Sequence, residues 1–206
     1  MDDRSTFLLE MYREMFADIN RHITVVWQSV GVVIGAFALF SLSEKQIMPL
    51  DIAISLIVML CGWLYAHMLD AGYWYNRNLV IIANIERQFL LGSDQKDIQF
   101  YFGKHRSGGN KMISHLRIQA SLGIGVGILV ILFHFFDRVL PGMSAEVSHF
   151  DVQRTLPYVV SLAVLIFGYR FGKDRDDAYQ SFLSNSPGIT VDNQGIVYGP
   201  GHTVDP

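Results

Sequence analysis

Four stretches of the chain are almost wholly apolar, and the charged residues gather between them. They cover residues 23–43, 52–69, 119–136 and 156–172. A helix on the surface of a soluble protein needs a polar face, and the middle of the first and third stretches has none. As a helix, the first stretch covers about 31 Å, which matches a hydrocarbon core of about 30 Å. The pattern therefore predicts an all-α integral membrane protein with four spans.

The loops between the stretches predict how the spans are arranged and oriented. The first and third loops are short, which favours an antiparallel helical bundle. Only three of the 16 lysines and arginines lie in these two loops, namely Lys45, Arg138 and Arg154. Since basic residues collect on the cytoplasmic side, we expect both termini and the central loop in the cytoplasm.

Two amphipathic segments extend the first two spans on the cytoplasmic side. Residues 5–22 and 72–91 both carry apolar residues at helical spacing. Aligned as antiparallel neighbours, they place Tyr12 near Ile81 and Ile19 near Trp74, so we expect a long helical hairpin. The alternative is a helix that lies on the bilayer surface, but the second segment has too few basic residues to favour it.

The chain thus divides into four predicted regions. Residues 1–92 hold the amphipathic helix, the first pair of spans and a cytoplasmic helix. Residues 93–118 form a polar cytoplasmic loop, and residues 119–183 hold the second pair of spans. Residues 184–206 form a cytoplasmic tail, in which residues 189–191 and 196–198 flank a turn and predict a small β-hairpin.

We find no pattern of catalytic residues in the sequence. The seven histidines are scattered and the chain has one cysteine, Cys61, so no metal-binding spacing appears. The chain also lacks a phosphate-binding loop and a nucleophile elbow. We therefore expect no enzyme activity and no cofactor. A net charge of -3 gives no reason to expect direct nucleic-acid binding.

Small residues four apart mark faces on which the helices can pack closely. These candidate packing residues are Gly31 and Gly35, Gly62 and Ala66, and Gly123 and Gly127. They suit packing inside one bundle or packing between protomers, and we expect a homo-oligomer. The candidate polar residues in the spans are Gln28, His67 and His134. Both histidines lie near span ends, so we interpret them as ordinary interfacial residues.

The first 91 residues resemble the SLATT-type two-span effectors of bacterial antiphage defence. The resemblance rests on the segment from Glu10 to His22 running into a span, followed by a short outer turn, a second span and a cytoplasmic helix. Transmembrane effectors of retron systems are similar in size and plan. The resemblance implies a protein of the bacterial inner membrane, held silent until infection, that then perturbs the membrane and arrests or kills the cell. A sensor or regulatory complex would act at the cytoplasmic face.

Two other classes of function compete with this interpretation. The first is a non-catalytic accessory or scaffold subunit of a membrane complex. The second is a channel or transporter, which needs a polar pathway through the spans. The spans offer few polar side chains for such a pathway.

Overall fold

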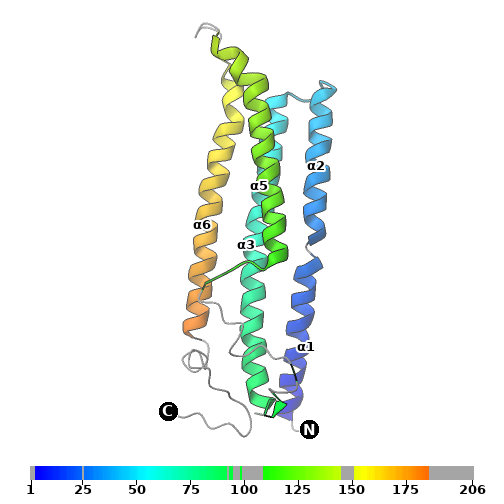
Figure 1. Ribbon diagram of the computed structural model, residues 1–206, viewed down its shortest axis with the longest axis vertical. Coiled ribbons are helices and arrows are strands. Elements are labelled where there is room, and N and C mark those ends of the chain that lie inside the picture. The colour runs from blue at the N-terminus through cyan, green and yellow to red at the C-terminus, as the bar shows by residue number, and fades with distance from the viewer. Residues whose placement is uncertain are drawn as a thin grey trace. The chain divides into compact units, whose positions relative to one another are not determined.

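The computed structural model describes residues 3–24, 26–91, 93–94, 98, 109–144 and 151–185, without the side chains of residues 22–24, 26, 28, 143 and 144. All regular structure in these ranges is helical. The α-helices are α1 (Asp3–Thr24), α2 (Val26–Glu44), α3 (Leu50–Phe89), α5 (Ser114–His134) and α6 (Leu156–Ser184), as Figure 1 shows. The π-helix η1 (Phe135–Val139) and the 3₁₀-helix η2 (Leu140–Ser144) follow α5, and the 3₁₀-helix η4 (Val152–Thr155) precedes α6.

Three helical segments are long and apolar enough to cross a membrane. They are Leu50–Phe89, Ser114–Gly142 and Val152–Ser184, and they contain three of the four predicted spans. The remaining predicted span, 23–43, coincides with the end of α1 and with α2, in which Ser29–Glu44 is a shorter apolar helix. The predicted hairpin at 189–198 lies outside the described residues.

The chain divides into two compact units. Residues 25–69 and 112–173 form one, which we call the span unit. Residues 1–24, 70–111 and 174–206 form the other, which we call the extension unit. Helices α3 and α6 each contribute to both units, and residues 114–118, predicted as loop, are the first turn of α5.

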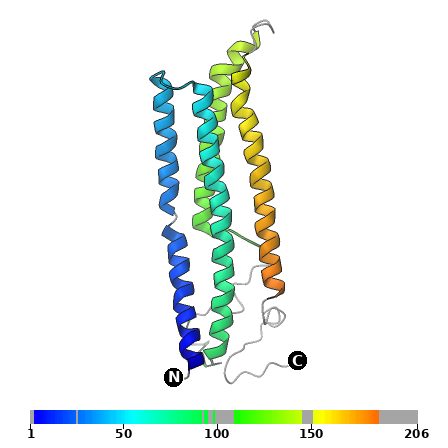
Figure 2. The same ribbon diagram turned by 180° about the vertical axis from the view of Figure 1, so that it is seen from behind.

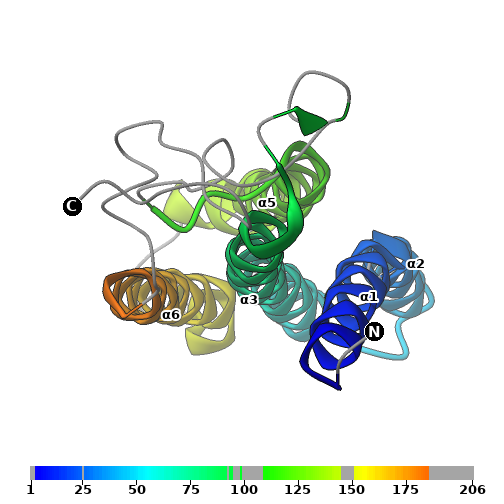
Figure 3. The same ribbon diagram turned by 90° about the horizontal axis from the view of Figure 1, so that it is seen from below.

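In the span unit, α2, α3, α5 and α6 run alternately in opposite directions (Figures 1 and 2). Helix α3 is the central one (Figure 3), and its buried residues Ile54, Ile57 and Cys61 form the core with Ala36 of α2. Partly buried residues of α5 and α6 pack against this core: Val126, Val130, Ile131, Val160 and Val164. All four helices therefore share one apolar core.

A tight turn joins α2 to α3. The backbone N–H of Ile47 donates to the carbonyl of Leu42, and that of Gln46 donates to the carbonyl of Ser43. This pair of bonds is the Schellman motif that ends many helices, in which one residue takes the left-handed conformation. That residue is Gln46, with a φ of 58°. The carbonyl of Pro49 then accepts from Ile52 and Ala53 in the first turn of α3.

In the extension unit, α1 packs along the second half of α3 through apolar residues. Buried Ile19, Leu79 and Ile82 form a cluster, and Tyr12 and Phe16 pack against it. The predicted apolar pairing of residues 5–22 with 72–91 is thereby confirmed, but its register is not. The Tyr12 hydroxyl donates to Glu86 Oε1 at 3.1 Å, about one and a half helical turns beyond the predicted partner Ile81. The prediction set the register from expected bilayer boundaries, whereas side-chain packing sets it in the structure.

The end of α6 packs against a second face of the same half of α3. Val80 and Tyr179 are fully buried there, beside Leu183. The guanidinium of Arg77 lies 5.0 Å from the ring of Trp74 and 5.6 Å from that of Phe182. Burial of aromatic rings and placement of a cation over a ring both stabilise packing, here that of α6 on α3. This half of α3 is therefore held from two sides.

Replacing Gln46 with glycine should stabilise the protein. A side chain in the left-handed conformation costs about 1–2 kcal/mol, which glycine does not pay. We expect Gln46→Gly to raise the thermal unfolding temperature of the detergent-solubilised chain. Gln46→Ala retains a Cβ and is the matched control, with no gain expected. A lower unfolding temperature for Gln46→Gly than for Gln46→Ala would contradict the conformation described here.

Candidate functional site

The first turn of α3 places a carboxylate inside the span unit. Asp51 lies two residues after Pro49, and only 1% of its side chain is exposed. An acidic residue in the first turn interacts favourably with the helix dipole. That interaction does not remove the cost of burying the charge, so the carboxylate needs partners.

His134, at the end of α5, is the closest partner of this carboxylate. Its Nε2 lies 2.7 Å from Asp51 Oδ1, and its side chain is fully buried. Its other ring nitrogen, Nδ1, lies 3.1 Å from the hydroxyl of Tyr158 in α6. Because an ionised carboxylate only accepts hydrogen bonds, Nε2 carries a proton, and the hydroxyl donates to Nδ1 when the ring is neutral. One imidazole thus connects α3, α5 and α6.

Arg138 supplies a positive charge from the π-helix that follows α5. Its Nη2 lies 3.4 Å from Asp51 Oδ2, and 37% of its side chain is exposed. Arg154 in turn donates to the carbonyl of Arg138 at 3.1 Å. A π-helix widens the helical turn and occurs frequently at functional sites. Here it follows His134 directly and carries Arg138 to the same carboxylate. We call the residues Asp51, His134, Arg138 and Tyr158 the polar latch.

The polar latch consists of hydrogen bonds and an ion pair that join helices to one another. Its carboxylate, imidazole and phenol come from three helices, while the surrounding core is apolar. No group of three or more His, Cys, Asp or Glu residues that could hold a metal ion occurs in the part of the chain that the structure describes. Ionisable groups within membrane helices are rare and mark functional positions by default. The latch is therefore the strongest candidate site in the span unit.

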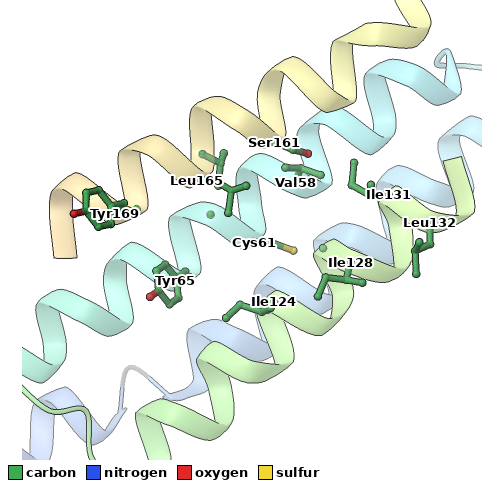
Figure 4. A pocket seen from close by; sticks show the side chains of 15 residues that line it. Val58, Cys61, Tyr65, Ile124, Ile128, Ile131, Leu132, Ser161, Leu165 and Tyr169 are labelled. Atoms are coloured by element: carbon green, nitrogen blue, oxygen red, sulfur yellow. The ribbon is translucent and has the colours of Figure 1, made fainter. Parts of the chain in front are cut away.

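An apolar groove lies between α3, α5 and α6 in the same unit (Figure 4). Its volume is about 560 Å³. Figure 4 shows Tyr65 and Tyr169 toward one end and Ser161 and Ile131 toward the other, with the Cys61 sulfur between α3 and α5. Four glycines line the groove: Gly62, Gly123, Gly127 and Gly168. Gly127 has the most room of the four, because the nearest atom to a Cβ placed there would be the Cβ of Cys61 at 3.7 Å.

The structure assigns different surroundings to the predicted packing residues. A Cβ added to Gly62 would collide with the side chain of Val164, so this glycine lets α3 and α6 approach closely. A Cβ on Gly123 would come within 3.1 Å of Leu64, and one on Gly127 would make only an ordinary 3.7 Å contact with Cys61. On the first span, a Cβ on Gly35 would lie 3.5 Å from Leu60, and one on Gly31 would meet nothing within 4 Å. Ala66 is buried.

The predicted polar residues of the spans also have different surroundings in the structure. His134 is not the ordinary interfacial histidine that we predicted, because it is fully buried and bonded to a buried carboxylate. His67 is half-buried, and its ring stacks on Trp63 at 5.4 Å between centroids. The side chain of Gln28 lies outside the described residues.

Sequence analysis missed Asp51, Arg138 and Tyr158. Arg138 was counted only as a loop charge, and the predicted second span began one residue after Asp51. A signal was nevertheless present in the sequence. In antiparallel spans the start of α3, the end of α5 and the start of α6 lie at one level, and each carries a polar or ionisable residue there. Aligning the outer ends of the spans would have brought these residues together.

Comparison of the chain with models of protein families, with curated proteins and with solved structures found no match. The interpretation of the site therefore rests on its geometry and chemistry.

Replacing His134 with alanine should destabilise the span unit strongly. Leaving a buried polar group without its hydrogen-bond partner costs about 1–3 kcal/mol, and more for a charged group, and the buried carboxylate of Asp51 would lose its closest partner. Thermal unfolding of the detergent-solubilised chain, followed by circular dichroism, measures the loss. His115→Ala is the matched control, because His115 is an exposed residue of α5. Equal unfolding temperatures for the two variants would show that the latch contributes nothing to stability.

Proposed function

We propose that the chain is a four-span protein of the bacterial inner membrane. The support for a fourth span is α2, whose 19 residues cover about 28 Å as a helix. No charged residue occurs in it before Glu44. Its Ala36 shares a core with α3, and its large residues Val30, Ile34 and Phe37 are exposed. An apolar exposed face beside three helices of membrane-spanning length suits contact with lipid.

We propose further that both termini lie in the cytoplasm. Lys45, Arg138 and Arg154 belong to the end of the span unit where α3 and α6 begin, and thirteen basic residues lie elsewhere. The positive-inside rule assigns that end to the periplasm. The latch then lies at the periplasmic end of the spans and the extension unit belongs to the cytoplasmic side.

Reporter fusions test this orientation. An alkaline phosphatase fused after residue 206 should be inactive, because the enzyme needs the oxidising periplasm for its disulfides. The same reporter inserted after Lys45 should be active. A green fluorescent protein at each position should give the opposite result. Activity of the phosphatase at the C-terminus would refute the orientation.

We propose that the chain acts as an effector of antiphage defence, perturbing the inner membrane when activated and arresting or killing the infected cell. Its first 91 residues follow the plan of SLATT-type effectors: an amphipathic helix, a span, a short turn, a second span and a helical extension. Helices α1, α2 and α3 occur in this order, and the turn is the short Schellman turn at Gln46. The four helices of the span unit are the elements that would rearrange.

The observation that carries this proposal is the polar latch. Replacing a buried ion pair with apolar residues is often neutral or stabilising, so such a pair is poor support for stability alone. Its best-attested use is to specify one arrangement over another. A scaffold subunit would use such a contact only to set the register of its helices. A protein held silent in one state and released into another needs, in addition, a contact whose loss frees the helices, and the latch joins three of them at one point.

A latch variant tests the effector role. We expect wild-type protein to depolarise the membrane on infection in the presence of its neighbouring genes, and Asp51→Asn to depolarise it at lower expression without infection. The carboxamide has no charge to attract Arg138, so the resting arrangement is weakened. A potential-sensitive dye follows the change in living cells.

The matched control is Asp151→Asn, at the same end of the span unit as Asp51. Asp151 accepts from the backbone N–H of Gln153, a cap that asparagine also forms. Its carboxylate also pairs with Arg154 at 3.6 Å, but both side chains are partly exposed, so this pair contributes little. This variant should behave as wild type. An unchanged potential for all three proteins, under strong expression and infection, would refute the effector role. A stable stoichiometric membrane complex recovered without toxicity would instead support an accessory or scaffold subunit.

A further inference from the structure

The apolar groove of the span unit opens on the surface of the protein. Among its lining residues, Leu165 is 69% exposed and Ile128 is 54% exposed. Both belong to helices long and apolar enough to cross a membrane. In a bilayer, the surroundings of such residues are lipid chains, so a groove of about 560 Å³ beside them is accessible to a chain from the side. No described side chain fills it.

The chemistry of the groove selects the kind of occupant. Its walls are aliphatic and glycine residues, with hydroxyl groups at Ser161, Tyr65 and Tyr169. The Ser161 hydroxyl is already donated to the carbonyl of Pro157 at 2.7 Å. The two tyrosines lie toward the same end (Figure 4), which is the end nearer to the start of α5. Tyrosine favours the boundary between hydrocarbon and headgroups, so the groove runs from the apolar interior toward one interface.

Basic residues follow the groove at that interface. Lys173 lies about one turn after Tyr169 on α6, and Arg117 lies two turns before Ile124 on α5, so each continues the face of its helix that lines the groove. Arg170 is next to Tyr169 in the sequence and therefore lies on another face of α6. All three are exposed. In the span unit, the described acidic residues are Glu44, Asp51, Asp137 and Asp151. They belong to the opposite ends of the helices. Asp70 and Asp174 are the next acids along the chain, and Asp70 pairs with Arg175 at 3.3 Å.

We propose that the groove binds one acyl chain of an anionic phospholipid from the cytoplasmic leaflet, with Arg117 and Lys173 holding its headgroup phosphate. Long basic side chains reach headgroups while their stems stay in the hydrocarbon. Basic residues near an anionic leaflet are attracted to it electrostatically. The proposal rests on the membrane position and orientation proposed above, and it is independent of the effector role.

Photocrosslinking of the full chain in vesicles tests the proposal. The vesicles contain phosphatidylcholine and phosphatidylglycerol, with a trace of phosphatidylglycerol that carries a diazirine in one acyl chain. We expect crosslinks to concentrate on Ile124, Ile128 and Leu165, as located by peptide mass spectrometry. A diazirine on phosphatidylcholine should give several-fold fewer crosslinks at these residues. Crosslinks spread evenly over the exposed faces of α5 and α6 would overturn the proposal.

A groove-filling variant and a matched control separate binding from general lipid contact. Gly127→Leu should reduce the crosslinks several-fold, since its Cβ makes only an ordinary contact and the remaining carbons enter the groove. Gly125→Leu is two residues away, has open space around its Cβ and does not line the groove, so it should leave the crosslinks unchanged. If Gly127→Leu fails to fold, Leu165→Trp fills the groove from an exposed position, with exposed Leu162→Trp as its control.

The charges are tested separately. Arg117→Gln combined with Lys173→Gln should abolish the preference for phosphatidylglycerol while crosslinks to the groove persist. Lys45→Gln, at the other end of the spans, should retain the preference. Absence of lipid adducts at the groove, together with a dimer of the chain in the same vesicles, would overturn the proposal in favour of a second protomer. The reporter fusions decide the orientation independently, and the membrane potential decides the effector role.

Discussion

The contact between Asp51 and His134 is the interaction on which the arrangement of the span unit depends. In a bilayer, apolar side chains gain little by leaving lipid for a protein neighbour, so apolar packing alone discriminates weakly between registers. The carboxylate of Asp51 is different, because it is stable only where the imidazole of His134 and the guanidinium of Arg138 reach it. The start of α3 and the end of α5 are therefore fixed at one level, and the hydroxyl of Tyr158 adds α6 to the same point. The aliphatic core then packs around a register that one polar contact has set.

The glycines of the same helices have two opposite effects on packing. Gly62 allows close approach, because the side chain of Val164 occupies the space that a Cβ would take. Gly127 does the reverse, since only Cys61 lies near it and the groove remains beside it. The same residue type thus closes one interface and opens another, depending on what the neighbouring helix presents. Small-residue spacing in a sequence indicates where backbones can approach, and the neighbour decides whether they do.

The sequence predicted those features that depend on one helix at a time. Apolar length located three spans, and helical periodicity brought Tyr12 and Ile19 onto the second half of α3. Features that depend on two helices were predicted less well. The register of α1 was wrong by more than a turn, and His134 was interpreted as interfacial. Distance along a span gives the depth of His134 but not the side of the helix on which it lies. Asp51, 83 residues earlier, could only be recognised as its partner after the spans had been aligned.

The proposed effector role requires helices that can change their arrangement, and the uneven packing of α3, α5 and α6 provides for this. Densely packed interiors resist small displacements, because every shifted side chain meets another. At the latch, three helices are joined by polar contacts of 2.7–3.1 Å, so no movement occurs there without breaking them. Along the groove, α5 and α6 have room on the side of Gly127 and Leu165. Loss of the latch would therefore release helices that are separated along the groove by the proposed lipid, which can be displaced, and not by fixed side chains. In the proposed role, the latch would determine when the helices move and the packing along the groove would determine the direction.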